Sequence, residues 1–484
     1  MTLLDLDRRS PYLSGAYEPV LDEITAVDLE VEGDLPVDLE GSFVRTGANP
    51  RFEPKGRYHW FDGDGMLHGV ELGGGTATYR NRFVRTAGLA ADEAAGECGW
   101  TGILEPPDFS KPGGPFKNTA NTDLVFHHGR LLALWWLGGE PYRIELPSLD
   151  TVGVDSVPRG LTSMSAHPKV DPRTGELVWF DYSPLPPYLT YGVLDADGSV
   201  THRVDIELDG PRLQHDIAIT ERYSLLFDMS MGWDLEAMAR GRTRIRFDRE
   251  APSRIGVIER AGSTVRWFDV APMFTYHTIN AWEEVGADGH ERVVLVGCRI
   301  GDPLVGDPGN PEGADGPTPV PTIANLRLEP YLHRWELDLT TGTATERQLD
   351  DRLTEFPRMD NRMLGARTRV AYSPRIAADR PELAFDGVIC YDTDTGVGVE
   401  SSYGDGWFGG ETTFAPRVGA GTAEDDGYVL TFASHEATGE SALLVLDAAR
   451  VGAGPDPRVR IPQRVPAGYH SWWVGVDDLA PPTP

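Results

Sequence analysis

Short strand-like runs that alternate with compact turns constrain the fold of this chain more than any other feature. The runs are rich in β-branched and aromatic residues and recur at 76–86, 130–136, 176–182, 224–229, 263–270, 292–298, 332–339, 386–392, 427–434 and 442–448. Many are separated by turn sequences such as DPRTGE (171–176) and DLTTGT (338–343), whose Asp and Gly residues suit hairpin turns with positive φ. This order predicts an antiparallel, all-β chain without βαβ units. Helical periodicity is scarce, and the clearest candidate is the short segment 232–241.

A weak internal recurrence favours one architecture for these strands. The sequences VWFD (178–181), VRWFD (265–269) and HRWELD (333–338) each place a tryptophan in a strand just before an acid. Repeated hairpins of propeller blades leave such a pattern, and so many strands need closure or radial repetition to protect their edges. We therefore predict a single β-propeller domain over residues 1–484, with an N-terminal lead-in of about residues 1–37 and loop insertions that include the Gly/Pro-rich stretch 301–322.

Charge and cysteine content exclude several classes of function. Acidic residues outnumber basic ones 75 to 44, which gives a net charge of -31, so the chain is unsuited to bind the phosphate backbone of a nucleic acid. Three widely spaced cysteines without a CxxC motif predict neither a disulfide framework nor a thiolate metal site. The sequence contains neither a signal-peptide pattern nor a long apolar run. We therefore expect a cytoplasmic protein.

Four of the 12 histidines share one kind of setting. His277 lies in the aromatic stretch MFTYHTINAWEE, and His167, His215 and His470 also stand at the edge of apolar strands. Each could be an ordinary buried imidazole that hydrogen bonds to a backbone carbonyl. In a propeller, however, the innermost strands line one axis, so residues this far apart in sequence can converge. Four neutral imidazoles would suit a borderline transition metal such as Fe(II).

The same histidine contexts belong to a longer series of motifs. The series includes GSFVRTGANPRF (41–52), HWFDGDGMLHGVEL (59–72), NTANTDLVFHHGRLLALW (118–135), EFPRMDNRMLGARTRVAYS (355–373) and EDDGYVLTFAS (424–434). With these motifs the chain resembles the carotenoid cleavage oxygenases. The resemblance implies a seven-bladed propeller with a cap of loops and short helices over an axial metal site. It also implies one Fe(II) per chain, held by His167, His215, His277 and His470, and O2 as the co-substrate that splits an alkene into two carbonyl fragments.

The resemblance further implies three glutamates that accept hydrogen bonds from the metal-binding imidazoles. Glu355 and Glu411 match two of these positions, whereas the third is occupied by Trp136. Metal-bound imidazoles usually donate their second N–H to an acceptor, so a carbonyl, a water or another acid is expected there. Glu140 is a conceivable substitute, although its place after two glycines favours an exposed turn.

The substrate prediction rests on the neighbouring residue, Trp135. Relatives that cleave phenolic stilbenes carry a lysine at this position, and an indole cannot supply that cation. We therefore predict a hydrophobic polyene, a carotenoid or apocarotenoid, as the partner molecule. Candidate substrate contacts are Trp135, Trp136, Phe274 and Trp472, although the tryptophans could instead pack between blades.

Other functions remain open from sequence alone. On the same scaffold the enzyme could cleave a stilbenoid or phenylpropanoid alkene. From another class, the chain could be a non-catalytic binding propeller or a calcium-dependent lactonase-like hydrolase. The apolar segments 183–192 and 229–241 predict a peripheral hydrophobic contact with a membrane, unless they pack inside the cap. No protein partner is inferred.

Overall fold

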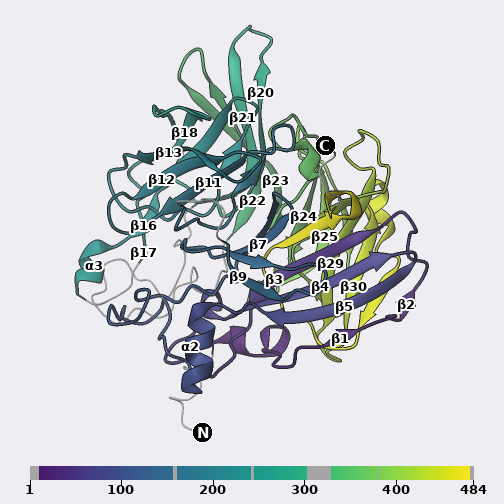
Figure 1. Cartoon of the computed structure of the whole chain (residues 1–484). Coiled ribbons are helices and arrows are strands. Elements are labelled where there is room, and N and C mark those ends of the chain that lie inside the picture. The colour runs from purple at the N-terminus through teal and green to yellow at the C-terminus, as the bar shows by residue number, and fades with distance from the viewer. Residues whose placement is uncertain (1–9, 156–160, 241–244, 302–328, 381, 480–484) are drawn as a thin grey trace.

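The strands form seven antiparallel blades of a β-propeller, as predicted (Figure 1). The computed structural model describes residues 10–155, 161–240, 245–301, 329–380 and 382–479, so the predicted insertion 301–322 lies outside the described residues except for Gly301. From the innermost strand outwards, blade 1 consists of β32 (Ser471–Gly475), β3 (Gly41–Ala48), β4 (Gly65–Gly73) and β5 (Thr76–Phe83). Blade 2 consists of β6 (Asp123–His127), β7 (Arg130–Leu134), β8 (Tyr142–Ile144) and β9 (Thr151–Val154). Blade 3 consists of β10 (Lys169–Val170), β11 (Leu177–Tyr182), β12 (Leu189–Leu194) and β13 (Val200–Ile206).

The remaining four blades follow in chain order. Blade 4 consists of β14 (Ala218–Ile219), β15 (Tyr223–Asp228), β18 (Ser253–Glu259) and β19 (Arg266–Val270). Blade 5 consists of β20 (Thr278–Val285), β21 (Glu291–Ile300), β22 (Pro330–Asp338) and β23 (Ala344–Leu353). Blade 6 contains β24 (Val370–Ile376), β25 (Phe385–Asp392) and β26 (Gly398–Ser402). Blade 7 contains β28 (Thr413–Pro416), β29 (Gly427–His435), β30 (Ser441–Asp447) and β31 (Arg458–Ile461). In blade 6 the segment 354–358 bridges to β24 and takes the innermost place. The hairpin β16 (Met231–Trp233) and β17 (Ile245–Phe247) is inserted in blade 4.

The ring is closed by pairing between the two ends of the chain. Strand β32 pairs with β3 in a register that sets Ser471 opposite Arg45. Two short strands of the predicted lead-in, β1 (Thr25–Ala26) and β2 (Val31–Glu32), pair with β5 and β31. Strand β27 (Trp407–Gly409) pairs with both β25 and β29 and so joins blades 6 and 7. Figure 1 accordingly shows the purple N-terminal strands beside the yellow C-terminal ones.

Apolar packing between the blades follows the strand alternation of the sequence. Trp179 and Trp335, from two of the recurrent motifs, are 1% and 0% exposed. Trp267, from the third motif, is only partly buried, because it lies on an outer strand under the Arg254 guanidinium at 4.9 Å. The recurrence therefore marks strands, but not equivalent places in each blade.

Helices are few and lie in the connections. Helix α3 (Leu235–Ala239) falls within the predicted segment 232–241, whereas α2 (Ala87–Ala95) was not predicted. Its ends carry recognisable signals, because the Thr86 side chain accepts a hydrogen bond from the Leu89 N–H at 3.1 Å and Gly96 adopts the left-handed conformation after the last turn. Among the described residues, the 3-10 turns are η1 (Pro11–Leu13), η2 (Gly15–Tyr17), η3 (Trp60–Asp62), η5 (Asn361–Met363), η6 (Ala448–Ala453) and η7 (Val476–Leu479). Within the described ranges, no helix combines the length and apolar content needed to cross a membrane.

Candidate metal centre

Four histidines meet where the innermost strands of four blades begin. His277 and His470 directly precede β20 and β32, and His167 and His215 stand two and three residues before β10 and β14. Their rings lie close together, with centroids 4.4 Å apart for His167 and His470 and 4.7 Å apart for His167 and His215. One potential ligand nitrogen from each of the four lies within 4.8 Å of the others, and all four side chains are buried. Residues 303 positions apart in sequence, from 167 to 470, are thus brought to one point by the propeller.

Two glutamates fix the orientation of two of these rings. Nδ1 of His277 hydrogen bonds to Glu355, and Nδ1 of His470 donates to Oε1 of Glu411 at 2.8 Å. Because each Nδ1 carries the proton toward its carboxylate, Nε2 is left with a lone pair. Glu355 lies in the inner segment of blade 6, and Glu411 lies two residues before β28 of blade 7. The carboxylates therefore come from blades that supply no histidine.

An arginine completes the partners of Glu411. Nε and Nη2 of Arg358 donate to the two carboxylate oxygens at 2.7 and 3.1 Å. Burial alone would raise the pKa of Glu411, but Arg358 and His470 hold it at about 2. Burial lowers the pKa of His167 and of His215 well below the usual range, and the neighbouring imidazoles lower both further. Burial lowers the pKa of His470 as well, so these three imidazoles are neutral at pH 7.

The position of the expected third glutamate has an aromatic environment. Trp136 is 5% exposed, and its ring lies 5.5 Å from that of Phe61. The His215 ring makes no hydrogen bond in the described part of the chain; it stands edge-on to Tyr276 at 4.8 Å. Glu140 is exposed and does not replace the missing acceptor. His215 is therefore positioned by ring packing rather than by a carboxylate.

Sequence reasoning missed a carboxylate at this centre. Oδ2 of Asp123 accepts a hydrogen bond from the His167 backbone N–H at 3.0 Å and lies 3.6 Å from Nδ1 of the same residue. This bond helps hold His167 at a φ of 68°, a left-handed conformation that costs a non-glycine residue about 1–2 kcal/mol. Asp123 opens β6, the innermost strand of blade 2. Its place directly after NTANT, at the start of a strand, was the signal available in the sequence.

The donor atoms fit a transition metal. Nε2 of His167 and Nε2 of His277 are buried and have no hydrogen-bond partner among the described residues. An unpaired buried nitrogen is costly unless a ligand satisfies it. The group of four contains imidazoles only, with no carboxylate. Such a set suits a borderline divalent ion and not calcium, which takes six to eight oxygen ligands.

A mostly apolar cavity borders three of the four histidines. It contacts His215, His277 and His470, and its other walls are Trp60, Phe61, Thr122, Tyr276, Ile300, Pro330, Glu355, Phe356, Ile376, Leu383 and Tyr469. Phe274 and Trp472 are not among these lining residues. Phe274 is 1% exposed behind Tyr276, with their rings 4.8 Å apart, and Trp472 packs against the cores of neighbouring blades.

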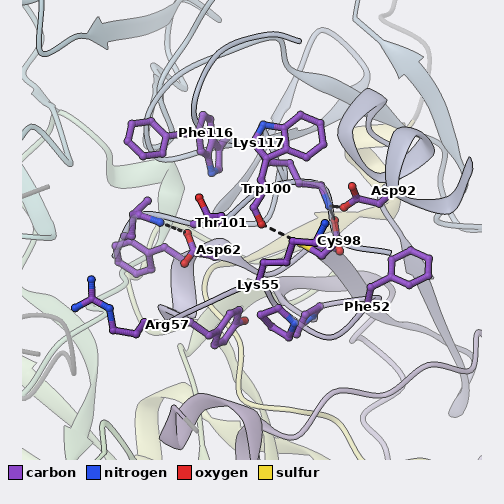
Figure 2. A pocket seen from close by; sticks show the side chains of 18 residues that line it. Phe52, Lys55, Arg57, Asp62, Asp92, Cys98, Trp100, Thr101, Phe116 and Lys117 are labelled. Carbon is purple, nitrogen blue, oxygen red and sulfur yellow. Dashed lines mark hydrogen bonds and ion pairs between the residues drawn. The ribbon is translucent and has the colours of Figure 1, made fainter. Parts of the chain in front are cut away.

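A further cavity, shown in Figure 2, adjoins this one through Phe61, which lines both. Trp135 also borders it, together with Phe52, Trp100 and Phe116. Three cations line this cavity, and each forms an ion pair. Lys55 pairs with Glu97, Arg57 pairs with Glu105, and Lys117 pairs with both Asp64 and Asp92. No unpaired cation is therefore found among the residues that line this cavity.

Comparison with known proteins agrees with this geometry. A family model described as "Retinal pigment epithelial membrane protein" matches residues 17–475. The chain is 35% identical to "Carotenoid 9,10(9',10')-cleavage dioxygenase 1" of Phaseolus vulgaris, over 97% of this chain and 90% of the bean protein. The chain belongs to the carotenoid cleavage oxygenase family.

Solved structures place this carotenoid cleavage oxygenase among enzymes with different substrates. Lignostilbene dioxygenase of Pseudomonas brassicacearum matches with a TM-score of 0.84 and 29% identity, over 97% of this chain and 99% of that one. Apocarotenoid oxygenase of Synechocystis matches with a TM-score of 0.81 and 26% identity, over 95% and 98%. One structure of the Synechocystis enzyme is of its cobalt-substituted form. The family and fold are thereby shown, while the choice between substrates depends on this chain's own residues.

Proposed function

We propose that this chain is a non-haem Fe(II) oxygenase that uses O2 to cleave a conjugated C=C bond of a carotenoid or apocarotenoid into two carbonyl products. The observation that carries the proposal is the set of four buried imidazoles, with unpaired nitrogens directed at one point beside an apolar cavity. The cleavage activity in the name of the bean relative supports it.

In this proposal each residue of the centre has a defined task. His167, His215, His277 and His470 would hold Fe(II), which when bound supplies the electron density that activates O2. Glu355 and Glu411 keep the Nδ1 protons of His277 and His470 in place, so that Nε2 stays free to bind metal. Arg358 keeps Glu411 ionised. None of these groups has to donate or remove a proton, because both oxygen atoms of O2 enter the products, one in each carbonyl.

The walls of the metal cavity contribute positioning and exclusion of water. Phe61, Tyr276 and Phe356 surround the imidazoles with apolar ring surface, against which a polyene can be held beside the metal. Glu355 also lines the cavity, but one of its oxygens accepts from both His277 and the Phe356 N–H. The other oxygen, Oε1, is buried and has no hydrogen-bond partner among the described residues. The proposed reaction moves no proton and therefore gives this carboxylate no acid–base task.

Two observations favour a polyene over a phenolic stilbene. Trp135 supplies apolar surface at the position where a lysine would be needed, and the nearby cations are neutralised by carboxylates. Cleavage of a stilbenoid is the second candidate, and the high TM-score with lignostilbene dioxygenase supports it.

Replacement of one histidine tests the metal centre. We expect His277→Ala to lose iron-dependent cleavage and most of its bound iron, because the remaining imidazoles no longer enclose the ion. Iron per chain, measured by atomic emission, and product aldehydes, measured by mass spectrometry, give the answer. His202→Ala, which changes a histidine outside the centre, is the control and keeps both iron and turnover. Full activity of His277→Ala would contradict the proposal.

A competition assay tests the substrate class. With an apocarotenal and resveratrol in one reaction, we expect the apocarotenal to be consumed at least tenfold faster, because the described residues that line the metal cavity and the cavity behind Phe61 include no unpaired cation to bind the phenol. Products are separated by chromatography and identified by mass. Preferential consumption of resveratrol would replace the carotenoid assignment with the stilbenoid one and leave the metal centre unaffected.

A further inference from the structure

A cavity of about 260 Å³ lies on the far side of two residues that wall the metal cavity. Trp60 and Leu383 border both spaces. The other walls come from the N-terminal segment, β25, β27 and β29, and from the stretch before β32; the apolar ones include Tyr17, Phe385, Phe408, Phe432 and Val465. One water needs roughly 10–15 Å³ of such space, so the cavity has room for a larger guest.

The feature that gives this cavity a chemical character is Arg45 of β3. Its side chain is buried, with 2% of the residue exposed, and it lines the cavity. Nη2 donates to the Pro466 carbonyl, while Nε is buried and has no hydrogen-bond partner. The described residues place no carboxylate within ion-pair distance of the guanidinium; its other neighbour is the Phe432 ring, 5.3 Å from Cζ.

The backbone around Arg45 leaves room for its guanidinium. A Cβ on Gly468 would lie 2.5 Å from Nε, and a Cβ on Gly410 would lie 3.7 Å from Nη1. The missing Cβ of Gly468 therefore lets the planar group lie against the main chain, whereas the distance at Gly410 is an ordinary van der Waals contact. Burial lowers the pKa of Arg45 to about 10, although Tyr79 and Glu411 act in the opposite direction. The side chain is nevertheless charged at pH 7.

Comparison with Arg358 shows what Arg45 lacks. Arg45 is buried and Arg358 is partly buried, but Arg358 has a bidentate carboxylate partner in Glu411. A buried charge without a partner is strongly unfavourable, and a guanidinium presents a donor fork that matches a carboxylate. Arg45 therefore lines the cavity as a charge that has no carboxylate partner among the described residues.

We propose that this cavity, the Arg45 cavity, binds the carboxylate end of an apolar molecule, with the carboxylate paired to Arg45 and the chain packed against the aromatic walls. This goes beyond the proposed function, since binding here requires no iron. The carboxylate could belong to an acidic apocarotenoid whose polyene extends past Trp60 and Leu383 to the metal cavity, or to a separate fatty acid. The ligand chemistry is the same in both cases.

Binding to the iron-loaded protein tests the proposal directly. Isothermal titration with decanoate, 1-decanol and formate is expected to give decanoate at least tenfold tighter binding than either of the others, because it alone offers both the charge and the chain. In Arg45→Met, a substitution that keeps similar volume, the preference for decanoate over decanol is expected to fall below twofold. Arg380→Met is the matched control: Arg380 also lines the cavity but is already paired with Glu436 at 2.6 Å, so the preference is kept.

A measurement that needs no variant guards against misfolding of Arg45→Met. The carboxyl ¹³C resonance of bound [1-¹³C]decanoate should remain that of the ionised form when the pH is lowered through the range in which free decanoate is protonated. Equal affinity for decanoate and decanol in the wild type, or for decanoate and formate, would overturn the proposal. A preference that persists in a folded Arg45→Met protein would also overturn it.

Turnover separates the two sources of the carboxylate. If the substrate carries it, the KM for an apocarotenoic acid is at least tenfold below that for the matching apocarotenal, the difference disappears in Arg45→Met, and decanoate inhibits competitively. If a separate fatty acid carries it, the two KM values stay equal in both proteins while decanoate still binds. Either result supports the Arg45 cavity. If the wild-type protein binds decanoate but cleaves neither apocarotenoid, the result counts against the proposed function and not against the Arg45 cavity.

Discussion

At the scale of single residues, the two matched glutamates have different environments. Glu411 accepts from His470, Arg358 and the Ser471 side chain, whereas Glu355 accepts from His277 and one backbone N–H. Because the pKa of Glu411 is lowered from 4.5 to about 2, its contribution to stability is fully present above pH 4.5 and is lost as the pH falls toward 2. Its charge is therefore maintained throughout the physiological range.

Removal of that charge should weaken metal binding without abolishing the fold. We expect Glu411→Gln to lose about 10–100-fold in iron affinity, the usual range for such outer partners of a ligand, because the amide holds the His470 ring less firmly and leaves Arg358 without its counter-charge. Competition with a coloured chelator measures the affinity. Glu140→Gln, which changes an exposed side chain, is the control. Wild-type affinity in Glu411→Gln would mean that ring packing alone positions His470.

At the scale of elements, the innermost strands determine both stability and the metal centre. The four histidines stand just before β10, β14, β20 and β32, while Asp123 opens β6. Strand β32 has the most consequential position, because it closes blade 1 with β3 and follows His470 directly. A substitution that destabilises β32 should therefore lower the affinity for the metal, whereas an equally destabilising substitution in an outer strand should leave that affinity unchanged.

A pair of tryptophan substitutions separates these two effects. Trp473 on β32 is 7% exposed and Trp335 on β22, the third strand of blade 5, is 0% exposed. Each Trp→Ala change should destabilise the fold by about 3–5 kcal/mol through the cavity it leaves. Only Trp473→Ala should also lower iron affinity, since it loosens the strand that directly follows His470. Urea unfolding and chelator competition measure the two quantities; parallel losses of affinity in both variants would contradict this assignment.

At the scale of the whole molecule, the pairing of both ends within blades 1 and 7 supports the proposal of a single domain. The surface is strongly acidic, with a net charge of -31. Of the two apolar segments considered for membrane contact, residues 229–233 are buried, while Leu185 in the other is 64% exposed and Leu235, beyond the buried part, is 39% exposed. Any peripheral attachment would therefore involve few side chains.

Flotation with liposomes tests that attachment. We expect weak binding to neutral phosphatidylcholine vesicles that changes little between low and high salt, because the contact is apolar. Binding to anionic vesicles should be weaker at low salt, since the acidic surface is repelled by them. Leu185→Glu should lower the co-floating fraction several-fold, and Val152→Glu, at a similarly exposed apolar site elsewhere, should not. Absence of co-flotation under every condition would remove membrane contact from the description of this protein.

The sequence by itself determined the strands, the turns and the fold class, because side-chain alternation and Asp/Gly turns are local properties of the chain. The runs 176–182, 386–392 and 427–434 each coincide with an observed strand to within one residue at either end. Through their motifs, His167, His215, His277 and His470 were also expected to share one centre, and the structure brings them together. Helix α2 was missed, because short alanine-rich segments lack the periodic apolar face on which helix prediction depends.

Only the tertiary structure decided which side chains complete the centre and which cavities surround it. Asp123 contacts His167 from another blade, Trp136 leaves His215 among aromatic rings, and Phe274 and Trp472 pack away from the metal cavity. Ring closure sets β3 against β32 and Gly468 lies against the Arg45 guanidinium, which has no carboxylate within ion-pair distance among the described residues. These relations depend on contacts between residues up to several hundred positions apart, and such contacts exist only after the propeller has closed.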